Sequence, residues 1–145
     1  MKIKNLDHWS ISTTQLDETR EFFENILGLE VGPRPNLMSK GYWMYTDGTA
    51  YVHLIEKDPK TIESKGSTSE SPAEGGLEDH IAFSVEDSHK VVESMKQKGI
   101  EYWDRLLPDR PLYQVFIKEP NGFVIELNDY TPALDKISPI VVYDD

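Results

Sequence analysis

The chain has 145 residues and no cysteine, and its 26 acidic residues outnumber its 15 basic ones, which gives a formal net charge of −11. The length suits one compact domain, or two small modules that share a core. The negative charge disfavours nucleic acids and anionic membranes as partners. Without cysteine there are no disulfides, thiolate nucleophiles or Cys-ligated metal centres. No apolar run approaches the roughly 20 residues of a membrane span, and the first residues lack a signal-peptide core, so we expect a cytoplasmic protein.

The first half of the chain predicts a strand, a helix and three further strands. Alternation of apolar and polar residues predicts a strand over Ile3–Thr13. The helix begins near Asp17, a plausible N-cap, and ends at Gly28. The three further strands are Leu29–Val31, Gly41–Thr46 and Thr49–Glu56, and the last two are joined by an Asp-Gly hairpin turn.

The segment between the two halves differs in composition. Residues 57–77 are rich in Ser, Gly, Glu and Pro and contain almost no apolar residues. This composition is typical of a flexible acidic linker. A lid over a binding site is the alternative interpretation.

The second half repeats the pattern of the first. The expected elements are a strand over Asp79–Val85, a helix capped by Asp87 or Ser88 and ending at Gly99, and strands over Ile100–Trp103, Leu112–Lys118 and Phe123–Asn128. LDHWSIST matches LEDHIAFSV, and AYVHLIE matches FVIELND, so the sequence indicates an internal duplication. We therefore predict a single α+β domain with βαβββ modules at 3–56 and 78–129. A tail follows at 130–145, which packs on the core or on a partner subunit.

Three of the four histidines and one glutamate occupy equivalent positions in the two modules. His80 follows His8 by 72 residues, and Glu126 follows His53 by 73. In each strand the alternation puts these side chains opposite the bulky apolar face that would receive the helix. The remaining histidine, His89, lies off the apolar face of the second helix, and we expect it on the surface as a control residue.

This combination of side chains predicts a metal site. A buried carboxylate among imidazoles is costly unless a cation or a proton compensates it. Three imidazoles and one carboxylate suit a divalent Fe, Mn, Ni, Co or Zn ion and do not suit Ca or Mg. Taken singly, each histidine is as well explained by a structural role, so the prediction depends on all four positions together.

The segments DHWSIS, VHLIE, DHIAFSV and EPNGFVIELND resemble the vicinal oxygen chelate superfamily, which includes glyoxalase I, methylmalonyl-CoA epimerase, bleomycin-binding proteins and extradiol dioxygenases. The resemblance covers nearly all of residues 4–129. It implies a half-open eight-stranded barrel of glyoxalase-like fold, often in a homodimer, with a metal inside the curved sheets. On this resemblance His8, His80 and Glu126 match widely shared metal-binding positions, and His53 stands where glyoxalase I has a Glu and the epimerase a Gln.

The resemblance implies a metal-dependent lyase or isomerase that acts on a small substrate with vicinal oxygens. Glu126 would be the catalytic base, Tyr51 is a candidate second proton carrier, and Arg110 and Tyr113 are candidates to bind an anionic substrate at the mouth of the cavity. Tyr51 as a barrel-filling aromatic and Arg110 as a solvated loop residue are the alternatives. Two other functions stay open: a ferrous iron-dependent extradiol dioxygenase, and a small-molecule binding protein without turnover.

Overall fold

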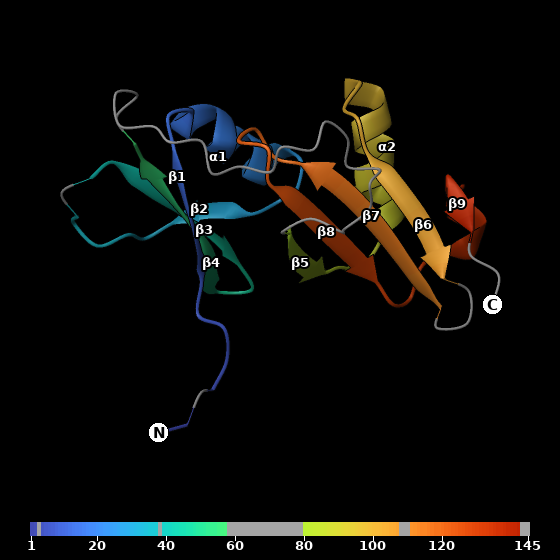
Figure 1. Cartoon of the computed structure of the whole chain (residues 1–145), viewed down its shortest axis with the longest axis horizontal. Helices are drawn as coiled ribbons and strands as arrows, with labels where there is room; N and C mark the ends of the chain where they lie inside the picture. Colours follow the sequence, from blue (N-terminus) through green and yellow to red (C-terminus); the bar gives the residue numbers. More distant parts are fainter. Residues whose placement is uncertain (3, 38, 58–79, 108–110, 143–145) are drawn as a thin grey trace. The chain divides into compact units, whose positions relative to one another are not determined.

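The computed structural model (Figure 1) describes residues 1–2, 4–37, 39–57, 80–107 and 111–142. These residues belong to two compact units, Met1–Ser64 and Lys65–Asp145, which we describe separately. Nearly all of the predicted linker at 57–77 lies outside the described residues. No helix in the described ranges is both long and apolar enough to span a membrane.

The first unit is a four-stranded mixed sheet with one helix. Its elements are β1 (Trp9–Thr13), α1 (Leu16–Asn25), β2 (Glu30–Gly32), β3 (Gly41–Thr46) and β4 (Thr49–Glu56). The strand order is β1-β4-β3-β2, with β1 parallel to β4 and the other pairs antiparallel. The helix α1 contacts β2, β3 and β4, so Phe23, Met44, Val52 and Leu54 are fully buried. The predicted turn at Asp47 and Gly48 is confirmed, because both residues have positive φ angles, as a type I′ hairpin turn requires.

The second unit repeats this arrangement and adds an edge strand. Its elements are β5 (His80–Ser84), α2 (Ser88–Lys98), β6 (Trp103–Leu107), β7 (Leu112–Lys118), β8 (Val124–Asp129), a 3-10 turn (Leu134–Lys136) and β9 (Val141–Val142). The strand order is β5-β8-β7-β6-β9, with β5 parallel to β8. The C-terminal tail therefore joins the second sheet through β9, which pairs in parallel with β6.

The register of the strands confirms the internal duplication. Ser10 of β1 pairs with His53 of β4, and Ala82 of β5 pairs with Glu126 of β8. These two pairs are equivalent in the sequence repeat. The chain is thus an α+β protein built from two βαβββ modules, as the sequence predicted.

Two predicted strand boundaries are corrected by the structure. The first strand begins at Trp9 rather than Ile3. The strand predicted over Ile100–Trp103 begins only at Trp103, because the N–H of Ile100 donates to the carbonyl of Met95 and closes the end of α2.

The N-terminal caps of both helices also differ from those predicted. The helix α1 begins at Leu16, so Asp17 lies in its first turn and Gln15 is the N-cap residue. At α2, Asp87 makes no capping bond with its side chain. The buried carboxylate of Asp129 on β8 caps this helix, since its Oδ2 accepts the backbone N–H of Ser88 at 3.1 Å and the Ser88 hydroxyl at 2.6 Å.

Candidate metal site

The predicted ligands on β4 and β5 alternate along each strand with more deeply buried apolar side chains. In β4, Val52 and Leu54 are fully buried, whereas His53 between them is only partly buried. In β5, His80 and Ala82 are exposed while Ile81 is partly buried. The predicted alternation of burial is therefore present in β4 and β5. In β8 both faces are buried, with Val124 and Glu126 on one face and Ile125 and Leu127 on the other.

The first unit brings His8 and His53 together. Because β1 and β4 are parallel, His8 lies diagonally beside His53, and their rings stack with centroids 3.9 Å apart and an interplanar angle of 11°. Trp43 of β3 is the cross-strand neighbour of His53 and stacks on its other side at 4.0 Å. His53 is thus held between two rings, which restricts the rotation of its side chain.

The contacts of both rings suit metal binding. Nδ1 of His8 lies 2.7 Å from the Asp7 carboxylate, an arrangement that orients the ring and leaves Nε2 for a ligand. Burial lowers the pKa of His53 below 6.5, and the neighbouring His8 lowers it further. A lowered pKa favours the neutral imidazole, which is the form that coordinates a metal.

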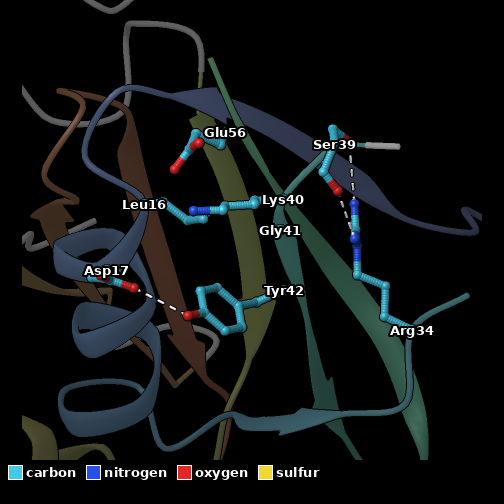
Figure 2. Close-up of a pocket in the computed structure, with 8 residues that line it drawn as sticks. All are labelled: Leu16, Asp17, Arg34, Ser39, Lys40, Gly41, Tyr42 and Glu56. Carbon is cyan, nitrogen blue, oxygen red and sulfur yellow. Dashed lines mark hydrogen bonds between the residues drawn. The ribbon is translucent and has the colours of Figure 1, made fainter. Parts of the chain in front are cut away.

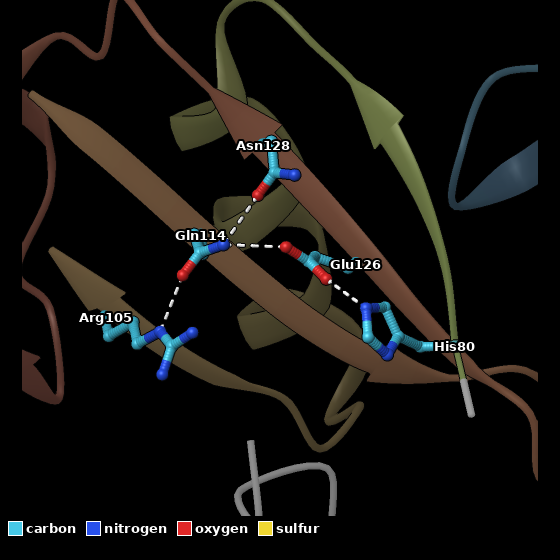
Figure 3. Close-up of polar contacts among 5 residues, drawn as sticks. All are labelled: His80, Arg105, Gln114, Glu126 and Asn128. Carbon is cyan, nitrogen blue, oxygen red and sulfur yellow. Dashed lines mark hydrogen bonds and ion pairs between the residues drawn. The ribbon is translucent and has the colours of Figure 1, made fainter. Parts of the chain in front are cut away.

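The second unit brings His80 and Glu126 together (Figure 3). Nε2 of His80 lies 2.8 Å from Oε2 of Glu126. Glu126 is only 7% exposed, and its other oxygen, Oε1, accepts a hydrogen bond of 2.7 Å from the side-chain amide of Gln114. One carboxylate oxygen is therefore held by an amide while the other faces an imidazole nitrogen.

The Gln114 amide is fixed on both sides. Its Nε2 also donates to Oδ1 of Asn128 at 3.0 Å, and its Oε1 accepts from Nε of Arg105 at 2.6 Å. Arg105, Gln114 and Asn128 are direct neighbours across β6, β7 and β8. Figure 3 shows the resulting chain of contacts from Arg105 through Gln114 and Glu126 to His80.

Each unit thus contributes two of the four predicted ligands. Within the parts of the chain that the structure describes, no three His, Asp or Glu side chains are grouped so that they could hold an ion. The donor types nevertheless fit a divalent transition metal, since imidazole nitrogens are common ligands of these ions and a carboxylate can complete the set. Convergence of all four ligands on one ion stays a prediction.

The other predicted site residues have different surroundings. Tyr51 is 39% exposed and shares the face of β4 that carries His53, in keeping with the prediction. Tyr113 does not have the expected place at a cavity mouth: it is fully buried, and its hydroxyl donates to Oδ2 of the buried Asp104. Burial, together with this bond, raises the pKa of Tyr113 well above 10. Arg110 lies outside the described residues.

The expectation that His89 is a surface residue is wrong. His89 is 8% exposed, and its Nδ1 has no hydrogen-bond partner among the described residues. It precedes Val92 by three residues and therefore shares the buried face of α2 with Val92 and Met95.

Sequence reasoning missed four residues that support the predicted ligands, namely Trp43, Arg105, Gln114 and Asn128. The signal that identifies them is strand parity. Asn128 is two residues from Glu126 and shares its face, and correct pairing of β6, β7 and β8 then adds Gln114 and Arg105 to the same row. Trp43 is found in the same way, from its pairing with His53.

A separate cavity of about 390 Å³ lies in the first unit, and Figure 2 shows the residues that line it. Tyr42 donates a hydrogen bond of 3.1 Å to Asp17 of α1, while Arg34 donates to the backbone and the side chain of Ser39. Tyr42 pairs with Leu54, whose side chain is buried on the helix side of the sheet, whereas His53 faces the other side. This cavity is therefore distinct from the candidate metal site.

Comparison with known proteins agrees with this architecture. Residues 5–127 match the family described as the Glyoxalase/Bleomycin resistance protein/Dioxygenase superfamily. Glyoxylase I 4 of Arabidopsis thaliana is 26% identical over 130 residues, which cover 88% of this chain and 71% of the relative. The mitochondrial methylmalonyl-CoA epimerase of Dictyostelium discoideum is 24% identical over 139 residues, covering 88% and 79% of the two chains.

Solved structures share the fold at low sequence identity. The fosfomycin resistance protein FosX of Listeria monocytogenes has a TM-score of 0.67 at 19% identity, covering 94% of this chain and 100% of its own. A FosX mutant complexed with Mn(II) and 1S,2S-dihydroxypropylphosphonic acid has a TM-score of 0.65 at 20% identity, covering 93% and 97%. With the family match spanning residues 5–127, the chain belongs to the glyoxalase/bleomycin resistance protein/dioxygenase superfamily.

Proposed function

We propose that this protein is a metal-dependent lyase or isomerase of the glyoxalase type, acting on a small substrate that chelates through vicinal oxygens. The observation that carries the proposal is the contact between Nε2 of His80 and Oε2 of the buried Glu126. A carboxylate in such a position is stable when a cation shares it. The relatives named glyoxylase I and methylmalonyl-CoA epimerase support the reaction class.

In this proposal His8, His53, His80 and Glu126 bind one divalent Fe, Mn, Co, Ni or Zn ion. The two modules supply one pair each, and their equivalent register is the support for a shared site. The bound ion would polarise the oxygens of the substrate and stabilise the negative charge that develops on proton removal. The proton transfers are assigned to side chains of the protein.

Glu126 is the proposed proton acceptor. Its Oε1 is held by Gln114, so rotation of the carboxylate is restricted and Oε2 is kept on the open side with His80. Tyr51, on the same face as His53, is the proposed second proton carrier. When a hydroxyl and an adjacent carbonyl exchange places, Glu126 would move one proton from one carbon to its neighbour, and Tyr51 would move the hydroxyl proton between the two oxygens, so that the product is an isomer of the substrate.

Metal analysis of single variants tests the ligand set. We expect wild-type protein to bind one ion per chain and His80→Ala or Glu126→Ala to lose it while circular dichroism stays unchanged. His89→Gln is the matched control, because His89 is a buried imidazole on α2 and outside the proposed set. Undiminished metal content in the Glu126 variant would refute the assignment.

A substrate screen distinguishes the reaction classes. Turnover of 2-oxoaldehydes or 2-hydroxyketones, followed by NMR, is expected from the metal-loaded protein. Oxygen uptake that requires ferrous iron and a catechol would instead select an extradiol-type dioxygenase. Tight ligand binding by metal-free protein, without any product, would select a binding module.

The assembly and location belong to the same proposal. A homodimer is proposed from the family resemblance, and light scattering of purified protein measures it directly. A cytoplasmic location is consistent with a chain that has no cysteine.

A further inference from the structure

The orientation of the Gln114 amide is determined by its two neighbours in the row of contacts beside Glu126 (Figure 3). Nε of Arg105 donates to Gln114 at 2.6 Å. A guanidinium has N–H donors and no acceptor, so the atom of Gln114 that faces it is the carbonyl oxygen. The amide nitrogen of Gln114 therefore points the other way and donates to Oε1 of Glu126 at 2.7 Å. A donor-only group on one side and a carboxylate on the other leave one possible orientation for this amide.

The Gln114 amide in turn determines the orientation of Asn128. Its nitrogen also donates to Oδ1 of Asn128 at 3.0 Å, so the oxygen of the Asn128 amide faces Gln114. Figure 3 shows the nitrogen Nδ2 of Asn128 turned away from Gln114. Among the residues that the structure describes, this nitrogen has no hydrogen-bond partner. Asn128 thus presents an oriented donor that the protein itself does not use.

The place of Asn128 in β8 sets this donor beside the proposed metal ligand. Asn128 follows Glu126 by two residues and shares its face of the strand. It is also the one residue of β8 that is not buried, so a small molecule can reach it. Two residues of a strand span about 7 Å, a distance that a small molecule bridges. Because the bond to Gln114 already restricts the side chain, a ligand would lose little entropy in ordering it.

The chemistry of the amide nitrogen indicates what it would bind. It carries two N–H donors and no acceptor, so its partner is an oxygen acceptor of the ligand. The amide is uncharged, and the chain has a net charge of −11, which disfavours a further anion. An uncharged carbonyl oxygen is therefore favoured over a carboxylate at this position.

We propose that Nδ2 of Asn128 donates a hydrogen bond to an uncharged carbonyl group of the substrate and so determines its specificity. Gln114 is the positioning residue, since it orients Asn128 without contacting the substrate. The inference rests on the proposed function. It narrows the substrate class to small molecules that carry, besides the vicinal oxygens, a second carbonyl group about 7 Å from the carboxylate of Glu126.

A pair of chelating probes tests this assignment. Both 5-oxohexanohydroxamic acid and 5-methylhexanohydroxamic acid chelate a metal through the two hydroxamate oxygens. They have nearly the same shape, but only the first carries a ketone oxygen, where the second has a methyl group. Calorimetry gives the Kd of each for the metal-loaded protein. We expect wild-type protein to bind the ketone about three- to tenfold more tightly, the contribution of one hydrogen bond.

Three variants make the result specific. Asn128→Leu removes the whole amide at similar volume, while Asn128→Asp keeps an oxygen for Gln114 and replaces only the nitrogen donor. Both variants should bind the two probes with Kd values within about twofold of each other. Asn36→Asp makes the same chemical change at an exposed residue of the first unit and should retain the full preference for the ketone.

Metal content measured on the same samples separates the possible failures. Loss of the preference in both Asn128 variants, with one metal ion still bound per chain, would support the assignment. An undiminished preference in both variants, or no preference in metal-loaded wild-type protein, would overturn the role of Asn128 and leave the proposed function intact. Failure of wild-type protein to bind metal would overturn the proposed function itself, and this inference with it.

Discussion

Replacement of Gln114 by leucine isolates the contribution of the amide that holds Glu126. The two side chains have similar volumes, and the site is only 6% exposed, so packing changes little. Leucine removes the hydrogen bonds to Glu126, Asn128 and Arg105 and leaves a buried carboxylate oxygen without its donor. Bonds to charged groups contribute about 1.5–3 kcal/mol each and a neutral one about 1 kcal/mol, but they share one amide and are not additive. We expect a loss of about 3–5 kcal/mol in the free energy of unfolding.

The same variant should also weaken metal binding. Loss of a partner that orients a metal ligand typically reduces the affinity about 10- to 100-fold. Urea denaturation of metal-free protein gives the free energy of unfolding, and calorimetric titration with the metal gives the metal affinity. Ser84→Ala is the control, since Ser84 is exposed in the same row of the sheet as Gln114 and Asn128 and should change either quantity little. A metal affinity within twofold of wild type in Gln114→Leu would refute the proposed support of Glu126.

Three further predictions concern buried polar groups away from the proposed ligands. Asp129→Asn should lower the free energy of unfolding by about 1.5–3 kcal/mol because it weakens the cap of α2. Asp87→Asn, which keeps a residue that tolerates the left-handed backbone at this position, should cost at most about 0.5 kcal/mol, and equal losses in urea denaturation would contradict the cap assignment. Tyr113→Phe should cost about 1–3 kcal/mol because Oδ2 of Asp104 loses its donor, while Oδ1 keeps the N–H of Ile140. The Kd for metal should not change, and a changed Kd would argue against a purely structural tyrosine. Burial raises the pKa of Glu119 above 4.5, so its contribution to stability is fully present below pH 4.5 and is lost as the pH rises through the folded-state pKa. Urea denaturation from pH 4 to 7 should show this loss of stability in wild type and not in Glu119→Gln. If the free energies of unfolding of the two proteins changed in parallel with pH, the role assigned to Glu119 would be contradicted.

The parts of the site that local sequence patterns determine could be predicted. Period-two alternation assigned His8, His53, His80 and Glu126 to the faces opposite the helices, and the internal repeat made the two strand pairs equivalent. Parallel pairing within each module then brings His8 to His53 and His80 to Glu126. The alternation and the repeat are read from the sequence itself, whereas the parallel pairings of β1 with β4 and of β5 with β8 join strands far apart in the chain.

The parts that depend on strand register and on tertiary contacts could not be predicted in the same way. Tyr113 and Gln114 are adjacent in the sequence and lie on opposite faces of β7. The register of β7 against β8 therefore decides which of the two side chains approaches Glu126. The cap of α2 comes from Asp129, 41 residues after Ser88, while the local candidate Asp87 makes no capping bond. The polarity of His89 favours a surface position, but its spacing of three residues from Val92 puts it on the buried face of α2.

The most direct test of the central claim is a crystal structure of the Mn(II)-loaded protein with an anomalous difference map. The proposal predicts one peak per site, bonded at about 2.0–2.3 Å to the imidazoles of His8, His53 and His80 and to the carboxylate of Glu126. The same coordinates would show whether the two pairs come from one chain or from two. A peak bonded to one pair alone, or a map with no peak at either pair, would contradict the proposed site.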